Sequence, residues 1–216
     1  GLVSPLGNDV SSSWDACTKG ISGISTFDNT INNSPVSIGG RIKDLDLSLY
    51  LDSKDTRRLD RFIQYGVIAA SQAIADSDFL NYSIDLTRAG VNFGSGIGGI
   101  ETIENNHKLY LEKGYKKVSP FMVPGSIINM ISGHISIKFG LRGSNVSTVT
   151  ACSSGNHCIG SAARSIAYGE SDVMVAGGSE MASTPLAISG FIAARALSTS
   201  NNPITASRPW DIDRDG

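Results

Sequence analysis

Two cysteines and a histidine lie within seven positions of the stretch "STVTACSSGNHCIGSAARSIAYG", residues 147–169. Such a group could hold a metal ion, form a redox pair or supply one nucleophile. A zinc site needs about four ligands in closely spaced pairs, and a thioredoxin-like pair needs Cys-x-x-Cys. Five residues separate Cys152 from Cys158, so neither pattern fits. We therefore expect no metal site here.

The residues around Cys152 fit a nucleophile on a strand-to-helix turn. The β-branched run 145–151 predicts a strand, and the small residues of 154–168 predict a helix. A thiol at a helix N-terminus faces aligned amide dipoles, which favour the thiolate. Cys152 is therefore the candidate nucleophile. Cys158 and Cys17, placed within predicted helices, are expected to be small buried side chains.

A second motif, "GSGIGG" at residues 94–99, has the G-x-G-x-x-G spacing between a predicted strand and a predicted helix. This is the context of a dinucleotide-binding loop. Such a loop is followed, about 20 residues on, by an acidic residue that ends a second strand. That distance falls in "LEKGYKK", where no strand is predicted. The sequence therefore favours glycines that let the backbone pack closely, with Ile97 projecting from the turn.

The elements that must position these motifs alternate along the chain. Residues 21–50 are rich in Ser, Asn, Gly and Pro and are predicted to be mostly loop. Apolar periodicity, capping residues and β-branched runs define the rest. We predict helices over residues 10–19, 57–76, 100–113, 124–140 and 154–168, and strands over 88–94, 145–151 and 172–180. This alternation indicates α/β layers around a largely buried sheet.

Composition excludes several classes of function. The chain has 216 residues, 40% of them hydrophobic and 18% charged, with a formal net charge of -2. These values are typical of a soluble globular protein and give no overall basic footprint for nucleic acid. No window offers the roughly 18 apolar residues of a membrane helix, and no signal peptide is visible. Three cysteines form no disulfide framework, which favours a reducing compartment.

The segment "TACSSGNHCIGSAARSIAYGESDVMVAGGSEMASTPLAISGFIAARALSTSNNPITASRPWDIDRDG" resembles the active-site region of the β-ketoacyl-acyl carrier protein synthases, of the synthase II type. "GLVSPLGN", "LDRFIQYGVIAASQAIADS", "GSGIGGIETIE" and "SPFMVPGSIINMISGHISIKFGLRG" resemble the same enzymes in the same order. The resemblance implies a thiolase-like α/β fold, in which each half contributes a five-stranded mixed sheet between helices. Residues 1–216 would be the N-terminal ketoacyl synthase domain without its first strand. Both ends of the chain read as turns, so we expect a piece of a longer polypeptide.

The resemblance implies a mechanism for Cys152. The matching cysteine accepts an acyl chain from acyl carrier protein, and a carbanion from malonyl-carrier protein then lengthens that chain by two carbons. The Cys152 amide would be one oxyanion donor, whereas the second donor and two catalytic histidines would belong to the C-terminal half. His107, His134 and His157 match none of those histidines, so we expect hydrogen-bonded packing roles. No cofactor is implied.

The resemblance also implies two sets of binding residues. Ile97, Ala151 and Phe191 would line the acyl pocket. Met122 stands where relatives often have an aromatic residue, in a segment that reaches the partner's pocket across a homodimer interface. A thioether leaves a softer wall than a ring, so chain-length preference stays open.

A basic cluster, "SKDTRRLDR", would by itself be a solvated helix face. In the family, however, an acidic acyl carrier protein docks on a basic rim, and positions of that rim match Lys54, Arg57, Arg58 and Arg195. The resemblance therefore implies docking at these four residues. It also implies a cytoplasmic location, or the matrix or lumen of an organelle with dissociated fatty acid synthesis.

Three functions remain open from the sequence. The first is a condensing enzyme of fatty acid elongation, which "HCIGSAARSIAYG" and "SRPWDIDRDG" favour. The second is a polyketide-type ketosynthase, whose cysteine segment often reads "TACSS". The third is a non-catalytic partner of the chain-length-factor kind, against which the presence of Cys152 argues.

Overall fold

The computed structural model describes residues 1–26 and 34–216. The chain divides into two compact units. Unit 1 comprises Gly1 and residues 46–181, and unit 2 comprises residues 2–45 and 182–216. The part of the predicted loop that covers residues 27–33 lies outside the described residues.

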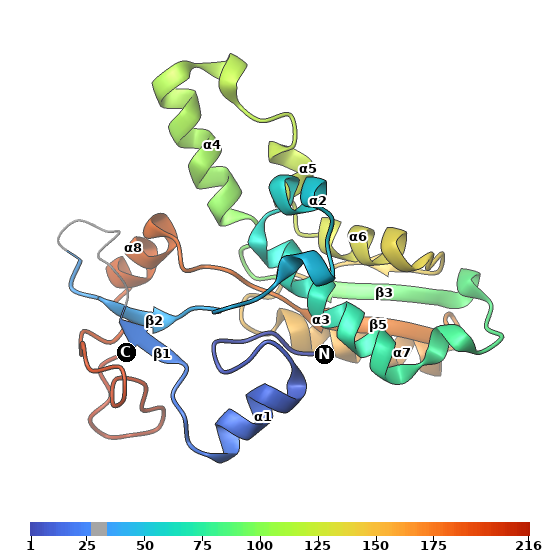
Figure 1. Ribbon diagram of the computed structural model, residues 1–216, viewed down its shortest axis with the longest axis horizontal. Helices are drawn as coiled ribbons and strands as arrows, with labels where there is room; N and C mark the ends of the chain where they lie inside the picture. The colour runs from blue at the N-terminus through green and yellow to red at the C-terminus, as the bar shows by residue number, and fades with distance from the viewer. Residues whose placement is uncertain (27–33) are drawn as a thin grey trace. The chain divides into compact units, whose positions relative to one another are not determined.

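Unit 1 carries an alternating set of helices and strands (Figure 1). Its helices are α2 (Ser53–Arg58), α3 (Arg61–Ser77), α4 (Ile100–Lys113), α5 (Met122–Ser126), α6 (Met130–Phe139) and α7 (Ser154–Ala167). Its strands are β3 (Ala89–Gly94), β4 (Asn145–Val146) and β5 (Val173–Gly178). Short 3-10 helices are η1 (Leu47–Leu49), η2 (Phe79–Asn81), η3 (Leu86–Arg88) and η4 (Tyr115–Lys117).

Unit 2 is built from two helices and a strand pair among its described residues. These are α1 (Val10–Thr18), α8 (Pro185–Ala193), β1 (Ile24–Thr26) and β2 (Ile38–Gly40). The two strands pair antiparallel, with Ile24 opposite Gly40. They interrupt the loop predicted for residues 21–50. The sequence did not predict them because strands of three residues are too short to show an alternating pattern. No helix formed by residues 1–26 and 34–216 is both long and apolar enough to cross a membrane.

The sheet of unit 1 has three parallel strands in the order β4-β3-β5. Figure 1 shows β3 and β5 side by side, with α6 and α7 on opposite sides of the pair. The resemblance implied five strands in a mixed sheet. Within the described residues the antiparallel pair β1-β2 forms a separate sheet in unit 2 instead of extending this one.

Alternation along β3 separates the two faces of the sheet. On one face, side chains from α3, α6, β3 and β5 form the hydrophobic core, with Phe62, Ile63, Val67, Val91, Phe93, Ile131, Ile135 and Val175 among its members. Each fully buried side chain of this kind contributes roughly 1.5–3 kcal/mol. The intervening residues of β3 face α7, and one of them, Gly94, brings the strand close to that helix.

Two segments that were each predicted as one continuous helix form two helices in the structure, although the apolar periodicity continues across the break. The helix predicted over 57–76 is α2 followed by α3, because Leu59 and Asp60 are extended and Asp60 Oδ1 accepts a hydrogen bond from the Phe62 amide at 3.2 Å. The helix predicted over 124–140 is α5 followed by α6, with an extended Ile127 between them. Both breaks depend on backbone conformation that the apolar pattern does not encode.

The strand predicted over 145–151 was wrong beyond Val146. Only Asn145 and Val146 pair with β3. The Ser132 hydroxyl lies within hydrogen-bond distance of the Phe93 amide at 3.0 Å and of the Val146 carbonyl at 2.7 Å. The Ser132 side chain thus binds the amide and the carbonyl that would otherwise continue the hydrogen bonding between β3 and β4. Strand β4 therefore ends at Val146, and the chain continues into the turn that carries Cys152.

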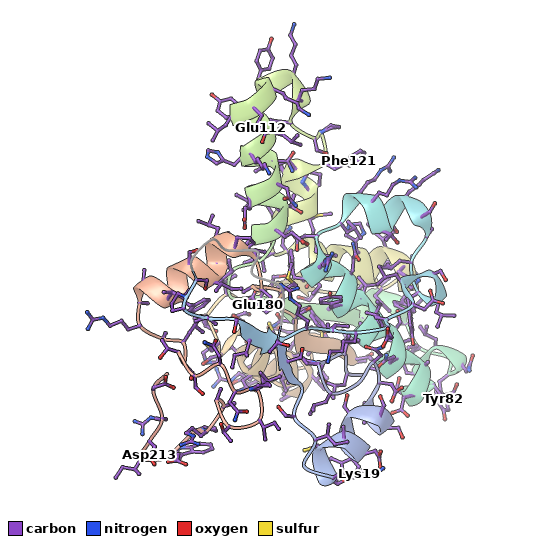
Figure 2. The ribbon with its side chains drawn as sticks, turned by 60° about the vertical axis from the view of Figure 1, so that its left-hand side comes forward. Lys19, Tyr82, Glu112, Phe121, Glu180 and Asp213 are labelled. Carbon is purple, nitrogen blue, oxygen red and sulfur yellow. The ribbon has the colours of Figure 1, made fainter. Side chains whose placement is uncertain are left out.

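One buried carboxylate ties α3 to α4. Asp60 is 3% exposed, and besides capping α3 its Oδ2 accepts a hydrogen bond from the Thr102 amide in the first turn of α4 at 2.8 Å. The residue before α4, Gly99, has no side chain with which to cap it. Figure 2 shows α4 projecting from this anchored end, with Glu112 near its far end and Phe121 on the returning segment.

Candidate functional site

Three segments that follow the three parallel strands meet at one edge of the sheet, which we call the carboxyl edge. The nucleophile turn, residues 150–154, follows β4; the glycine loop, residues 94–99, follows β3; and Ser179 and Glu180 follow β5. Carboxyl ends of parallel strands lie at the same edge, which is where α/β sheets usually bind ligands. The strand register places Gly94 directly opposite Gly178, so the last two segments start side by side.

The nucleophile turn is held in an unusual backbone conformation. Ala151 has φ of 52°, a left-handed value that costs a residue with a side chain about 1 kcal/mol or more. Ser154 Oγ stabilises the turn, accepting from the Thr150 amide at 2.9 Å and donating to the Ala151 carbonyl at 2.7 Å. Cys152 is exposed on this turn, just before α7 begins. The predicted position of the thiol is confirmed, and its catalytic role stays a prediction.

Small residues let α7 approach the sheet closely. A Cβ on Gly178 would lie 2.8 Å from Gly155 Cα, so the first turn of α7 contacts the end of β5 backbone to backbone. A Cβ on Gly94 would lie 2.3 Å from the Thr148 carbonyl oxygen and 2.9 Å from Cys158 Sγ. Cys158 is fully buried, as predicted. The nucleophile turn can therefore lie this close to the sheet because Gly94 and Gly178 have no side chains.

The glycine loop is closed by Glu180, which the sequence analysis missed. Glu180 Oε2 accepts hydrogen bonds from the Gly96 and Ile97 amides at 2.7 and 2.9 Å. Its Oε1 accepts from the Ser95 hydroxyl at 2.8 Å and the Gly98 amide at 3.2 Å. Because an internal carboxylate occupies the amides that would cradle a phosphate, the loop is not a dinucleotide site. The available signal was an acidic residue at the end of the predicted strand 172–180.

Of the residues expected to line an acyl pocket, Ile97 and Ala151 lie together at the carboxyl edge. Both are exposed, and a Cβ on Gly96 would lie 3.2 Å from the Ala151 carbonyl oxygen, so the glycine loop abuts the nucleophile turn. Met122 is half-buried at the start of α5. Phe191 belongs to α8 in unit 2, where it lines a cavity of about 470 Å³. Pocket lining stays a prediction for all four residues.

The three histidines occupy different environments. His157 Nδ1 lies 2.7 Å from Thr150 Oγ1, so its hydrogen bond is confirmed, but the ring is exposed and does not pack as predicted. His134 is half-buried on α6; burial lowers its pKa, and the nearby Asp55 carboxylate partly opposes that effect. His107 is exposed on α4, so its predicted packing role was also wrong.

Cys17 was predicted to be buried and is exposed. Helix α1 buries only Ser13 and Ala16, and the next residue turns by about 100° away from that narrow face. Within residues 1–26 and 34–216, no three His, Cys, Asp or Glu side chains gather closely enough to hold a metal ion.

Three of the four expected docking residues share helix α2. Asp52 caps this helix by accepting from the Asp55 and Lys54 amides, and these hydrogen bonds lower the pKa of its carboxyl. Lys54, Arg57 and Arg58 are exposed. The Arg58 guanidinium lies 4.2 Å from the centre of the Phe121 ring, beside Met122. Arg195 is exposed in unit 2.

Comparison with known proteins identifies the family. The family model "Beta-ketoacyl synthase, N-terminal domain" matches residues 1–216. A curated relative, the 3-oxoacyl-[acyl-carrier-protein] synthase 2 of Vibrio cholerae, is 53% identical over 220 residues, covering 100% of this chain and 53% of the relative. The chain therefore spans about half the length of the curated relatives it matches.

Solved structures agree with the sequence comparison. A β-ketoacyl synthase from Burkholderia phymatum superposes with a TM-score of 0.87 at 30% identity, over 99% of this chain and 53% of that one. A type II polyketide ketosynthase, solved with its acyl-carrier protein and a hexaketide, gives a TM-score of 0.72 at 25% identity, over 90% of this chain and 53% of that one. These likenesses confirm the thiolase-like α/β fold, and the chain belongs to the β-ketoacyl synthase family, whose N-terminal domain it matches along its whole length.

Proposed function

We propose that the complete protein is a 3-oxoacyl-[acyl carrier protein] synthase of fatty acid chain elongation, an acyltransferase that forms a carbon-carbon bond. The observation that carries the proposal is the exposed Cys152 thiol on a tight turn at the N-terminus of α7. The 53% identity to a 3-oxoacyl-[acyl-carrier-protein] synthase 2 supports the substrate class. Residues 1–216 would supply the N-terminal ketoacyl synthase domain and would be inactive alone.

In the proposed reaction, Cys152 Sγ attacks the thioester carbonyl of an acyl-carrier protein. The bond to the carrier sulfur breaks, and the carrier leaves as a thiol with the proton that Cys152 has lost. Malonyl-carrier protein then loses carbon dioxide, which leaves an electron pair on its α-carbon. That carbon attacks the Cys152 thioester and expels the thiolate. The Cys152 amide would donate to the oxyanion in both steps, and we expect the second donor and two histidines to come from the other half of the protein.

A polyketide-type ketosynthase is the second candidate. The likeness to the ketosynthase of a type II polyketide synthase supports it, at 25% identity. A non-catalytic chain-length-factor-like partner is a third, but the exposed thiol on a strained turn argues for catalysis. The much higher identity to 3-oxoacyl synthases makes the fatty acid enzyme the better supported proposal.

The reaction itself tests the proposal. The full-length protein, given acyl-carrier and malonyl-carrier proteins, is expected to release carbon dioxide and to form a 3-oxoacyl-carrier product two carbons longer, detected by mass spectrometry. Omitting malonyl-carrier protein should leave only the acyl-enzyme. Repeated condensation to a poly-oxo chain would instead support the polyketide function. Release of carbon dioxide with no longer product would contradict both.

We further propose that α2 docks the acidic carrier protein through Lys54, Arg57 and Arg58, and that Arg195 of unit 2 is a docking residue in its own right. The polyketide ketosynthase solved with its carrier protein supports a carrier partner. None of the ion pairs in the described part of the chain involves these four side chains, so their charge is available.

Arg57 gives the cleanest test of docking, because Arg58 also stacks on Phe121. Arg57→Glu is expected to slow association with acyl carrier protein about tenfold at low salt, since attraction between opposite patches mainly raises the on-rate. The matched control is Lys19→Glu, which reverses a charge whose exposed ion pair with Asp15 contributes little. Surface plasmon resonance across ionic strengths measures both. An Arg57→Glu protein with wild-type kinetics and salt dependence would exclude docking at α2.

A homodimer is also proposed. Apolar side chains of β4, its following segment and α7 are exposed: Val146, Val149, Ile159 and Ile166. Exposed apolar groups on neighbouring elements mark surfaces that a protein partner covers. A monomeric mass for the full-length protein in solution would contradict the dimer.

We place the protein in the cytoplasm, or in the matrix or lumen of an organelle with dissociated fatty acid synthesis. Acyl transfer needs a reduced thiol, and Cys152 is free. Cell fractionation that recovered the protein from an oxidising compartment would contradict this location.

A further inference from the structure

Glu180 makes an unusual concentration of hydrogen bonds for an exposed side chain. Three consecutive amides of the glycine loop and one hydroxyl donate to its two carboxylate oxygens, at 2.7 to 3.2 Å. Hydrogen bonds to an ionised acceptor are roughly twice as strong as neutral ones. Figure 2 labels the side chain, which lies two residues beyond the end of β5. Glu180 is therefore bound to the middle of the loop that carries Ile97.

The two ends of the glycine loop are held without Glu180. At the start, the Ser179 amide donates to the Gly94 carbonyl at 3.0 Å. At the other end, the Gly99 amide donates to the Ser126 carbonyl at 3.0 Å, and Asp60 anchors the first turn of α4. Glu180 thus binds the part of the loop between these two ends, residues 95–98, where the Gly98 amide also donates to Ser95 Oγ at 3.1 Å. A change at Glu180 should alter the loop while the strands and α4 stay in place.

The middle of the loop is also the part that faces the nucleophile turn. A Cβ on Gly96 would lie 2.8 Å from Glu180 Oε2 and 3.2 Å from the Ala151 carbonyl oxygen. The Gly96 backbone therefore lies between the Glu180 carboxylate on one side and Ala151, the residue before Cys152, on the other. Since Oε2 also accepts from the Ile97 amide at 2.9 Å, the carboxylate holds the Ile97 backbone beside the nucleophile turn.

We propose that Glu180 is a positioning residue that fixes Ile97 beside the nucleophile turn and thereby sets the acyl chain length that Cys152 accepts. This rests on the proposed function, in which an acyl chain on Cys152 lies against Ile97. Glu180 itself touches neither the acyl chain nor the thiol; it acts through the three amides it binds.

The test uses Glu180→Gln in the full-length protein. Glutamine keeps the shape of the side chain and one acceptor oxygen, but it loses the charge and the second acceptor. We expect the ratio of kcat/KM for Cys152 acylation by dodecanoyl-carrier and hexanoyl-carrier thioesters to change about tenfold. The matched control is Ser179→Ala, which removes a hydrogen bond to the Phe62 carbonyl in the same segment. It should lower the thermal midpoint while leaving that ratio unchanged.

A double-mutant cycle separates positioning from a general structural effect. If Glu180 acts through Ile97, the change in the ratio caused by Glu180→Gln should disappear when Ile97 is already alanine, because coupled residues are not additive. An equal loss of acylation for both chain lengths, or additive effects in the cycle, would overturn the inference. Normal discrimination in Glu180→Gln would overturn it as well. A wild-type protein that is not acylated at Cys152 would instead overturn the proposed function itself.

Discussion

Replacement of Cys152 by alanine is expected to abolish acyl-enzyme formation, whereas Cys158→Ala should retain it. Cys152 is exposed on the nucleophile turn, and Cys158 is fully buried against β3. Removing the Cys158 sulfur leaves a small void beside Gly94 that costs about 1–2 kcal/mol of stability and leaves the Cys152 thiol in place. Intact mass after incubation of the full-length protein with an acyl-carrier thioester measures the result.

Cys17 supplies the control for this experiment. It is also an exposed free thiol, but it lies on α1, away from any strand-to-helix turn. If exposure alone governed acylation, Cys17→Ala would lower the acyl mass gain as Cys152→Ala does. We expect Cys17→Ala to behave as wild type. Acylation that persisted in Cys152→Ala and vanished in Cys158→Ala would reverse the assignment of the nucleophile.

The second large effect is expected from Gly94→Ala. The added Cβ would lie 2.3 Å from the Thr148 carbonyl oxygen, a backbone atom that no rotamer change can move. Overpacking of a tight interior costs typically about 1–3 kcal/mol, and a clash with backbone belongs at the upper end of that range. The strand and the nucleophile turn must separate, so the acylation rate should fall together with the thermal midpoint.

Gly160→Ala is the matched control for Gly94→Ala. Gly160 lies on α7 with open space where its Cβ would be. Alanine there should stabilise the helix by about 0.5–1 kcal/mol and leave acylation intact. Circular dichroism melting and the acyl mass gain measure both variants. Equal stability and activity of Gly94→Ala and wild type would show that α7 does not depend on this close contact.

The sequence predicted those elements whose signals are local. Strands β3 and β5 and helices α4 and α7 begin and end close to the predicted residues, because short runs of small and apolar residues mark the strands and closing glycines such as Gly114 and Gly169 mark the helix ends. The early end of β4 depends on the Ser132 hydroxyl, which belongs to helix α6. Such a contact between distant segments leaves no periodic trace in the sequence.

The candidate site shows the same division. Cys152 was located correctly because its turn and helix are adjacent to it in sequence. Glu180 was missed because it meets the glycine loop across more than eighty residues, through the pairing of β3 with β5. Exposure of Cys17 was also missed, since the burial of a helix face depends on what packs against it.

The backbone contact between α7 and β5 limits how this protein can change. Gly155 and Gly178 meet without side-chain atoms between them. A Cβ on Gly178 would lie 2.8 Å from Gly155 Cα and 3.1 Å from Gly155 N, so no neighbouring side chain can shrink to make room for it, whereas a Cβ on Gly155 would lie at an ordinary 3.5 Å from Gly178. Variation can act on side chains elsewhere at the carboxyl edge, while the distance from the sheet to the turn that carries Cys152 is inherited unchanged.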